Sequence, residues 1–319
     1  MRTVSVIIPV MNEKDTIREI ANRIEAVFED KVEISVVLKE IVFIDDGSTD
    51  TTWNEIQGAI GLSGKIKGVR LRRNFGKAAA LQVGVSESTG DIIITMDGDL
   101  QDDPKEIPKF LKLIDSGADL VSGWKKVRHD PLGKTLPSKL FNRVTGMVTG
   151  VKLHDFNCGF KAYRREVFDS VRLYGELHRF IPALAHAMGF KVEELIVEHH
   201  PRRFGSSKYG VNRLLKGFLD LLTVVIITKY NSRPGHLFGG LGVVVGAIGL
   251  LLFLYLAFEW LGGAAIGNRP LLTTSTLLMT VGLQFTLFGM IAELIVANRQ
   301  IETTPNIVAE VKTSETFIT

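Results

Sequence analysis

The sequence of 319 residues has little of what marks several large protein classes. It contains a single cysteine, Cys158, so no disulfide can form within the chain, which is typical of a domain that folds in a reducing compartment. The formal net charge is only +3, and no basic excess indicates a nucleic-acid partner. The apolar run at the start is shorter than that of a signal peptide and is expected to be a strand. These absences favour a cytoplasmic globular domain.

Apolar residues are distributed unevenly along the chain. Residues 1–210 are mixed and rich in charge, whereas residues 237–261 and 271–297 are apolar almost throughout. Each of these two runs exceeds the roughly 20 residues that a helix needs to cross a bilayer. We therefore predict a two-helix transmembrane anchor over residues 234–298. The alternative is a buried helical hairpin of a soluble protein, but such helices rarely stay apolar around their whole circumference for this length.

The charge around the two apolar runs predicts their orientation. Four basic residues precede the first run and Arg299 follows the second, whereas only Arg269 lies between the runs. Because basic residues concentrate on the cytoplasmic side, we expect a multi-pass membrane protein whose catalytic domain and tail (299–319) are both cytoplasmic. Residues 211–233 have apolar side chains at helical spacing, which favours an interfacial amphipathic helix or, as an alternative, a core helix. The four basic residues are Arg213, Lys216, Lys229 and Arg233.

The first 210 residues alternate apolar strands with amphipathic helices. This alternation is typical of an α/β fold whose mainly parallel sheet is covered by helices on both faces. In such a sheet ligands bind beyond the carboxyl ends of the strands, so the residues that follow each strand are the candidates for a site. The expected strands cover residues 4–9, 40–45, 69–71, 90–97 and 119–122, and the expected helices cover 17–28, 78–88 and 104–116.

Acidic residues follow two of the expected strands. Asp45 and Asp46 end one strand, and Asp97 and Asp99, separated by one glycine, end another. Carboxylates this close repel each other unless a cation neutralises them, and a hard divalent cation takes oxygen ligands while leaving positions for a diphosphate. Gln101 adds a neutral oxygen two residues further on. The pattern predicts a site for Mg²⁺ or Mn²⁺ at Asp97, Asp99 and Gln101, with a solvated acidic turn as the alternative.

Four short motifs occur in an order known from one enzyme family. They are Pro-Val-Met-Asn-Glu at 9–13, Asp-Asp-Gly-Ser at 45–48, Arg-Asn-Phe-Gly-Lys at 73–77 and Asp-Gly-Asp-Leu-Gln at 97–101. On these motifs, residues 3–230 resemble the family-2 glycosyltransferases with the GT-A fold, a Rossmann-like domain that binds nucleotide-sugars. More narrowly, the chain resembles polyprenyl-phosphate glycosyltransferases such as dolichol-phosphate mannose synthase and bacterial undecaprenyl-phosphate glucosyltransferases.

The resemblance implies an activity and a set of donor-side residues. A hexose would pass from a nucleotide-sugar of the GDP-mannose or UDP-glucose type to a polyprenyl or dolichyl phosphate at the cytoplasmic membrane face, with inversion and with Mg²⁺ or Mn²⁺ bound. Asp99 and Arg202 would act in catalysis, Arg202 by holding the departing diphosphate. Donor binding would involve Pro9, Asn12, Glu13, Ile44, Asp46, Lys77, Asp97 and Lys208, and the metal would bind Asp97, Asp99 and Gln101.

The resemblance also implies acceptor-side residues. Lys125, Lys134 and Ser138 would bind the acceptor phosphate. Asp155 would act in catalysis as a base or by accepting a hydrogen bond from a sugar hydroxyl, and Glu176 and His178 are rival candidates for that role. For any one of these three, a buried and satisfied structural group is the alternative interpretation. Cys158 is expected to be inert packing, and His199-His200 is expected to be structural because no convincing set of metal partners accompanies it.

Two other functions remain as alternatives. A processive polysaccharide synthase resembles this fold, but its Gln-x-x-Arg-Trp segment is missing from the sequence and two spans make a poor channel. A non-catalytic membrane scaffold or transport accessory derived from a transferase is the other, and the acidic strand ends argue against it. The partners implied are a nucleotide-sugar, a polyprenyl phosphate and the membrane, with a homo-oligomer suggested by related enzymes.

Overall fold

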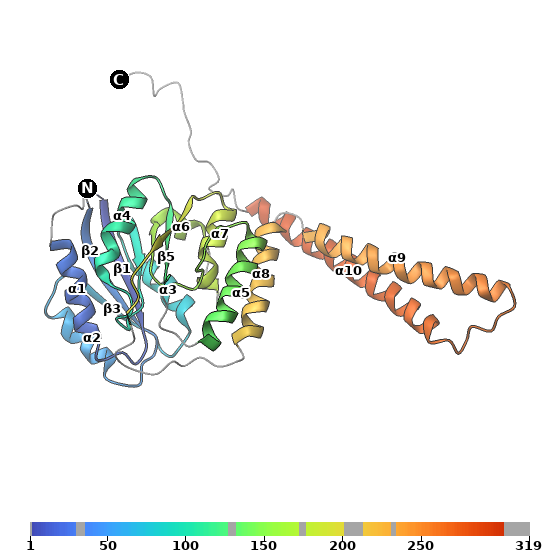
Figure 1. Cartoon of the computed structure of the whole chain (residues 1–319), viewed down its shortest axis with the longest axis horizontal. Coiled ribbons are helices and arrows are strands. Elements are labelled where there is room, and N and C mark those ends of the chain that lie inside the picture. Colours follow the sequence, from blue (N-terminus) through green and yellow to red (C-terminus); the bar gives the residue numbers. More distant parts are fainter. Residues whose placement is uncertain are drawn as a thin grey trace, which may run out of the picture. The chain divides into compact units, whose positions relative to one another are not determined.

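The structure, a computed structural model, describes residues 2–29, 36–126, 132–171, 177–200, 213–230 and 234–302. The chain divides into two compact units, residues 1–224 and 225–319. The first unit is an α/β domain and the second is a pair of long helices (Figure 1). The predicted fold class is confirmed, while the boundaries predicted between domain, interfacial helix, anchor and tail stay predictions.

A seven-stranded mixed sheet forms the centre of the first unit, in the order β3-β2-β1-β4-β6-β5-β7. β6 is antiparallel to both β4 and β5, and the other neighbouring strands are parallel. The sheet is therefore mainly parallel, as predicted, with one strand inserted out of chain order. The strands are β1 (Arg2–Val10), β2 (Val36–Asp45), β3 (Ile66–Arg70), β4 (Ile92–Thr95), β5 (Leu120–Trp124), β6 (Lys161–Arg164) and β7 (Val192–Ile196).

Helices cover both faces of this sheet. One face packs against helices α1, α2 and α4. The other packs against α3, where the glycine Gly84 lets the helix lie directly on Ile7 and Ile44. The helices of this unit are α1 (Ile17–Glu29), α2 (Thr52–Ile60), α3 (Lys77–Glu87), α4 (Ile107–Asp115), α5 (Leu132–Thr149), α6 (Arg165–Ser170), α7 (Ile181–Ala187) and most of α8 (Arg213–Lys229), with short 3₁₀ helices η1 (Pro104–Glu106) and η2 (Leu177–Phe180).

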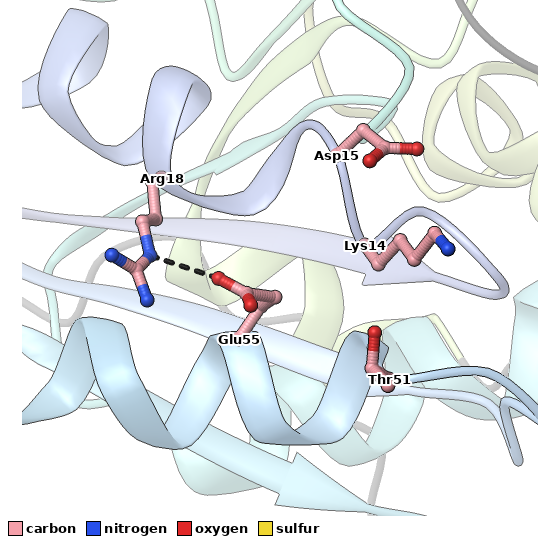
Figure 2. Close-up of a pocket in the computed structure, with 5 residues that line it drawn as sticks. All are labelled: Lys14, Asp15, Arg18, Thr51 and Glu55. Carbon is pink, nitrogen blue, oxygen red and sulfur yellow. Dashed lines mark hydrogen bonds and ion pairs between the residues drawn. The ribbon is translucent and has the colours of Figure 1, made fainter.

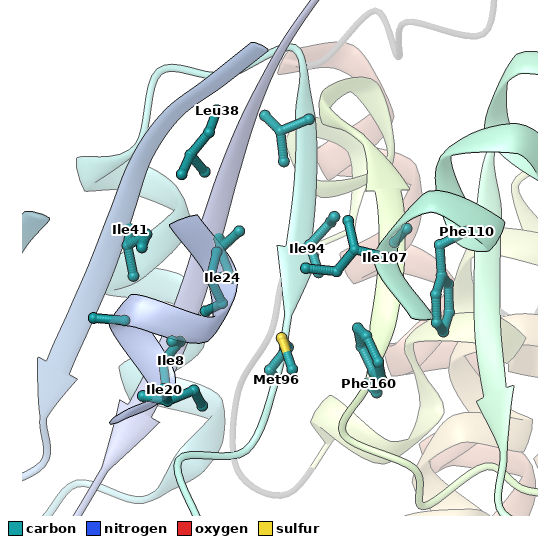
Figure 3. Packing of buried hydrophobic residues seen from close by; sticks show 14 of the residues in the cluster. Ile8, Ile20, Ile24, Leu38, Ile41, Ile94, Met96, Ile107, Phe110 and Phe160 are labelled. Atoms are coloured by element: carbon teal, nitrogen blue, oxygen red, sulfur yellow. The ribbon is translucent and has the colours of Figure 1, made fainter. Parts of the chain in front are cut away.

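The main hydrophobic core lies between the sheet and helices α1 and α4. Figure 3 shows Ile24 of α1 beside strands β1 and β2, and Ile107 and Phe110 of α4 facing Ile94 and Phe160. The rings of Phe110 and Phe160 lie 4.5 Å apart between centroids. Each such side chain contributes about 1.5–3 kcal/mol when it is fully buried, so this layer fixes the strands whose ends form the site.

Strand register brings the predicted site segments to one edge. Asp45, at the carboxyl end of β2, lies opposite Val10, at the carboxyl end of β1. Thr95, the last residue of β4, pairs with Lys161, the first residue of the antiparallel β6. The loops after β1, β2, β4 and β5 therefore meet the start of β6 at the same edge, as expected for ligand binding in an α/β sheet.

The second unit contains two helices long and apolar enough to cross a membrane, α9 (Pro234–Leu261) and α10 (Pro270–Glu302). They pack closely through glycines, because a Cβ added to Gly282 would lie 2.5 Å from the Cα of Gly246. At one end Glu293 Oε2 accepts the backbone N–H of Gly235 at 2.8 Å. The two predicted spans are confirmed as helices, and their side chains outside the helix–helix contact are largely exposed.

Helix α8 belongs in part to the core of the first unit. Leu221 and Val224 are buried, whereas Leu219 and Leu222 are half exposed. The apolar pattern predicted from the sequence is therefore split between packing onto the α/β domain and an exposed apolar side. The core-helix interpretation applies to the buried side of α8, and the interfacial role of its exposed side stays a prediction.

Candidate active site

The loop after β2 is held in place by hydrogen bonds to the carboxylates of Asp45 and Asp46. Asp45 is buried and its Oδ1 accepts the backbone N–H of Ser48 at 2.8 Å. Asp46 accepts two backbone N–H groups, from Phe75 at 2.7 Å and from Gly76 at 3.0 Å. These bonds hold the loop of residues 73–77 beside the Asp-Asp-Gly-Ser turn. The structure thus gives Asp46 an organising role, and its predicted contact with the nucleoside stays a prediction.

A glycine makes that close approach possible. Gly47 has a left-handed φ of 72°, and a Cβ at this position would lie 2.5 Å from the backbone carbonyl carbon of Arg73. An L-residue is disfavoured on both counts. The motif therefore needs glycine for two reasons that are independent of any ligand.

The loop after β1 is tied to the same turn. Asn12 has a φ of 56°, donates its backbone N–H to Ser48 Oγ at 2.9 Å and accepts the N–H of Thr49 on its Oδ1 at 2.8 Å. The backbone N–H of Glu13 donates to Thr52 Oγ1 at 2.9 Å. Pro9, Asn12, Glu13 and Asp46, all predicted for the nucleoside, are therefore brought together at one place.

Ile44 is a different case. Its side chain is fully buried in β2 against Gly84 of α3. The structure therefore places that side chain in the core beneath the nucleoside segment, and its predicted ligand contact is not supported by its position.

The acid loop, residues 97–101, lies beside Lys77, and the charge of Lys125 also acts on it. Lys77, the first residue of α3, forms an ion pair with Asp97 Oδ1. Gly159 lies so close on another side that an added Cβ would be 2.6 Å from Asp97 Oδ2. Leu100 adopts a left-handed φ of 60°, and the backbone N–H of Gln101 donates to Asp99 Oδ1 at 3.2 Å. Left-handed backbone at a non-glycine residue is uncommon and concentrates at functional sites.

The electrostatics of Asp97 follow from these neighbours. Burial alone would raise the pKa of this carboxyl, but the ammonium groups of Lys77 and Lys125 lower it well below its usual range. Asp97 is therefore ionised at any physiological pH. Its side chain is 35% exposed, so the carboxylate remains accessible at the edge of the sheet.

The acid loop is pinned to the segment that follows β7. Gln101 accepts the backbone N–H of His200 at 2.9 Å, and Asp102 and His199 form an antiparallel bridge. His200 Nε2 lies 3.3 Å from Asp103 Oδ2. The chain thus reaches residue 200 beside the acid loop.

A set of metal-type ligands occurs here that was not predicted. Ligand atoms of Asp103, Glu198 and His200 lie within 4.8 Å of one another. The expectation that His200 has no metal partners therefore needs correction, because β7 brings Glu198 and His200 to a loop almost 100 residues earlier. His199, whose backbone bridges to Asp102, fits the structural role that was expected.

Lys125, the residue after β5, pairs with Asp102, the residue after the acid loop. Its Nζ is 2.7 Å from Asp102 Oδ1, with side-chain exposures of 12% and 0% for the lysine and the aspartate. Burial alone would lower the pKa of Lys125, but the carboxylate of Asp102, with Asp97 nearby, raises it. This ammonium is permanently charged and already paired, and its predicted contact with the acceptor phosphate stays a prediction.

Asp155 is fixed by its neighbours in β5 and β7. Glu194 Oε1 accepts the backbone N–H of His154 at 2.7 Å and that of Asp155 at 3.1 Å, and its Oε2 is 2.6 Å from His154 Nδ1. The His154 ring stacks on Trp124, with centroids 4.0 Å apart. Asp155 itself is buried and accepts the N–H of Asn157 at 3.0 Å. Trp124 and His154, which precede Lys125 and Asp155 in the chain, are therefore held together in one cluster with Glu194.

Three further titratable groups have pKa values shifted by burial. Burial lowers the pKa of Lys161, whose Nζ donates to the backbone carbonyls of Phe156 and Cys158. Burial also raises the pKa of the Cys158 thiol to about 12, which fits the expected inert role. Burial lowers the pKa of His178 well below its ordinary value. The charges of Lys77 and Asp97 act on the His178 ring, and its predicted role as a rival to Asp155 stays a prediction.

Several predicted residues have no described side chains. Arg202, Lys208 and Glu176 lie outside the described residues, and Lys134 and Ser138 lie in α5 where only the backbone is described. Their proposed roles therefore stay predictions.

A hollow of about 530 Å³ is lined by none of the residues predicted for the donor. Figure 2 shows it between the start of α1 and helix α2, lined by Lys14, Asp15, Arg18, Thr51 and Glu55. Arg18 Nε and Glu55 Oε2 pair at 2.8 Å across it. Its walls have charges of both signs, so it offers no net charge to an anionic donor.

The acid loop fits a hard divalent cation. Asp97 and Asp99 supply carboxylate oxygens from one turn of backbone. Leu100, between Asp99 and Gln101, has a left-handed φ that sets the direction of this turn. Mg²⁺ and Mn²⁺ prefer oxygen ligands of this kind. The nearby Asp103, Glu198 and His200 add further ligand atoms at the same edge.

Comparison with known proteins agrees with this geometry. Residues 5–172 match the glycosyl transferase family 2. The dodecaprenyl-phosphate galacturonate synthase of Rhizobium johnstonii is 40% identical over 298 residues, covering 91% of this chain and 87% of that protein. The undecaprenyl-phosphate 4-deoxy-4-formamido-L-arabinose transferase of Pseudomonas syringae is 34% identical, covering 92% and 85%. That of Klebsiella pneumoniae is 36% identical, covering 92% and 88%.

Solved structures show the same fold. Glucosyl-3-phosphoglycerate synthase from Mycobacterium tuberculosis in complex with Mn²⁺, UDP and phosphoglyceric acid superposes with a TM-score of 0.55 at 19% identity, covering 70% of this chain and 78% of that one. Its complex with UDP gives 0.53 at 20% identity, covering 70% and 80%. A family match over half of the chain and relatives aligned along nine-tenths of it lead to one conclusion: the chain belongs to glycosyl transferase family 2 and is a glycosyltransferase whose homologues use polyprenyl-phosphate acceptors.

Proposed function

We propose that the protein transfers a sugar from a nucleotide-sugar to a polyprenyl phosphate at a membrane surface. The observation that supports this most is the acid loop with Lys77 at the carboxyl edge of the sheet, in a chain that also contains two helices of membrane-spanning length. Relatives named for transfer to dodecaprenyl and undecaprenyl phosphate support the acceptor.

The donor diphosphate binds at the acid loop in this proposal. Asp97, Asp99 and Gln101 would hold Mg²⁺ or Mn²⁺, which when bound supplies positive charge for the diphosphate. Lys77, already at Asp97, places an ammonium group at the same point. The nucleoside lies along the end of β1 and the loops after β1 and β2, beside Pro9, Asn12, Glu13 and Asp46.

A second source of positive charge follows β7. Arg202 and Lys208 are proposed to hold the diphosphate as negative charge develops on it, which is where fixed cations act most effectively. The described chain supports this location, because His200 donates its backbone N–H to Gln101 of the acid loop and Arg202 follows two residues later.

The acceptor phosphate approaches from the side of β5 and α5. Lys125, Lys134 and Ser138 are proposed to position it, and Lys125 is supported by its place beneath the acid loop. A phosphate oxygen is already an anionic nucleophile, so orientation contributes more than proton removal. Asp155 is proposed to accept a hydrogen bond from a sugar hydroxyl rather than to act as a base.

The reaction is a single displacement. An oxygen of the lipid phosphate bonds to the anomeric carbon from the face opposite the leaving group. The bond from that carbon to the nucleoside diphosphate breaks, and its electron pair leaves with the diphosphate. The products are a polyprenyl phosphate sugar of inverted anomeric configuration and a nucleoside diphosphate.

Donor and orientation are the finer parts of the proposal. UDP-sugars are the first donors to test, because relatives are named for galacturonate and for a substituted L-arabinose and fold neighbours were solved with UDP. GDP-mannose and UDP-glucose stay predictions from the sequence. The two spans are proposed to anchor residues 1–210 on the cytoplasmic side of the membrane, and a homo-oligomer remains a proposal as well.

The test uses the purified full-length protein in detergent with Mn²⁺ and undecaprenyl phosphate. A panel of UDP-galacturonate, UDP-glucose and GDP-mannose is assayed for release of nucleoside diphosphate and for lipid-linked sugar by mass spectrometry. Asp99→Ala is expected to lower the rate by about 100-fold or more, whereas the control Asp115→Ala, which changes an acid paired with Arg2 away from the site, keeps it. If no donor yields a lipid-linked product, a non-catalytic scaffold is the better interpretation.

A further inference from the structure

The imidazole of His178 has a buried ring nitrogen without a hydrogen-bond partner in the described part of the chain. His178 lies in η2, which packs against α3, the helix that begins with Lys77. Its Nδ1 is buried and makes no hydrogen bond within the part of the chain that the structure describes. The charged groups that act on the ring are Lys77, Arg179, Lys161 and Asp97.

The chemistry of this ring selects the kind of partner. Burial lowers the pKa of His178 well below its usual value, and the neighbouring cations Lys77 and Arg179 lower it further, so the imidazole is neutral. A neutral imidazole offers no charge to a phosphate. Its Nδ1 is a donor in one tautomer and an acceptor in the other, and a hydroxyl group satisfies either.

A ligand that hydrogen-bonds to Nδ1 explains why this position contains histidine rather than an apolar residue. Buried polar atoms in native proteins nearly always have a hydrogen-bond partner, because an unpaired one is costly. A leucine or phenylalanine would fill the same space without that cost. In the proposed function the diphosphate lies at Lys77 and Asp97, whose charges act on the His178 ring, and the sugar is attached to that diphosphate.

We propose that a hydroxyl of the transferred sugar hydrogen-bonds to His178 Nδ1, which makes His178 a residue that recognises the donor sugar. The inference rests on the proposed function, since it takes the donor diphosphate to lie at the acid loop. It assigns to His178 a contact with the sugar itself, separate from the groups that bind the nucleotide.

The test compares two ligands on the full-length protein with Mn²⁺. His178→Leu is expected to lower kcat/KM for the best UDP-sugar by about 10-fold to 100-fold. The affinity of this variant for UDP alone should change by less than about threefold, because UDP has no sugar to be transferred. His178→Asn, which keeps a polar group near the position of Nδ1, is expected to restore part of the loss. The matched control is His186→Asn, an exposed histidine of α7, which is expected to behave like the unchanged protein.

Two outcomes overturn the inference. Equal losses for UDP and UDP-sugar would place His178 at the nucleotide or in the fold, and unchanged kinetics in His178→Leu would remove any contact. A structural role also predicts a lower unfolding temperature for His178→Leu, whereas removal of an unpaired polar atom does not. If the protein transfers no sugar at all, the proposed function fails, and His178 is judged from the binding of intact UDP-sugar relative to UDP.

Discussion

Replacing Asp102 by asparagine is expected to destabilise the protein strongly, because it leaves the ammonium of Lys125 buried without its counter-ion. The two groups are 2.7 Å apart, and their side chains are 0% and 12% exposed. Removing one partner of a buried pair costs about 3–5 kcal/mol. For a unit of this size, 1 kcal/mol corresponds to about 2–4 °C in the unfolding temperature, so a decrease of roughly 6–20 °C is expected.

The assay is thermal unfolding of the full-length protein in detergent, followed by tryptophan fluorescence. The matched control is Glu87→Gln, because Glu87 and Lys67 form a pair at the same distance of 2.7 Å but with side chains 46% and 42% exposed. Exposed pairs contribute about 0–1 kcal/mol, so this control should change the unfolding temperature little. The two substitutions therefore differ in burial rather than in geometry.

A double substitution separates the buried charge from simple loss of packing. With Lys125→Met added to Asp102→Leu, no uncompensated charge remains, and the stability is expected to return to within about 1 kcal/mol of the unchanged protein. If Asp102→Asn costs no more than Glu87→Gln, or if the double substitution is no more stable than the single one, the pair is not the buried counter-ion that the distances indicate.

Three other predictions use groups around the acid loop. Gly159→Ala places a Cβ 2.6 Å from Asp97 Oδ2, so transfer activity should fall by roughly 100-fold, and steady-state kinetics with a circular-dichroism check of folding would test this. The Cys158 thiol, with its pKa raised to about 12 by burial, should stay unmodified by iodoacetamide at pH 8 until the protein unfolds, as mass spectrometry can show. Because burial lowers the pKa of His178 only in the folded state, the unfolded chain takes up a proton that the folded one does not as pH falls below about 6.5. The unfolding free energy should then decrease by up to about 1.4 kcal/mol per pH unit, and denaturant titrations of His178→Asn should lack this loss.

Local pattern was sufficient for the strands and the acidic ends. The run at residues 40–45 predicts a strand that ends in carboxylates, and β2 does end at Asp45. Pattern was less informative for short elements, and helix α2 (Thr52–Ile60) was not predicted. Its nine residues include Trp53, Asn54 and Gly58, which are poor helix formers, so the helix depends on packing against β2 and β3.

Contacts between distant segments could not be predicted in the same way. The pair of Lys125 and Asp102 and the cluster of Glu194 with His154 exist because β6 is inserted between β4 and β5 and because β7 lies beside β5. Strand order in space is not a property of local periodicity. The same reason explains why His200 was expected to lack metal partners, since Asp103 reaches it only through this topology.

Lys77 leads to a last prediction, because its ion pair with Asp97 competes with any cation that binds this carboxylate. Both side chains are about one-third exposed, so the pair contributes at most about 1 kcal/mol. Lys77→Met should then bind Mn²⁺ alone up to about fivefold more tightly. In the unchanged protein, Mn²⁺ binding to Asp97 frees the Lys77 ammonium to contact the diphosphate. The variant lacks this ammonium, so it should bind UDP in the presence of Mn²⁺ more weakly. Calorimetric titration of Mn²⁺, and of UDP with saturating Mn²⁺, measures the two effects separately. Opposite signs are the diagnostic result: if both affinities fall together, Lys77 supports the fold of the loop, and if both rise, its ammonium never reaches the diphosphate.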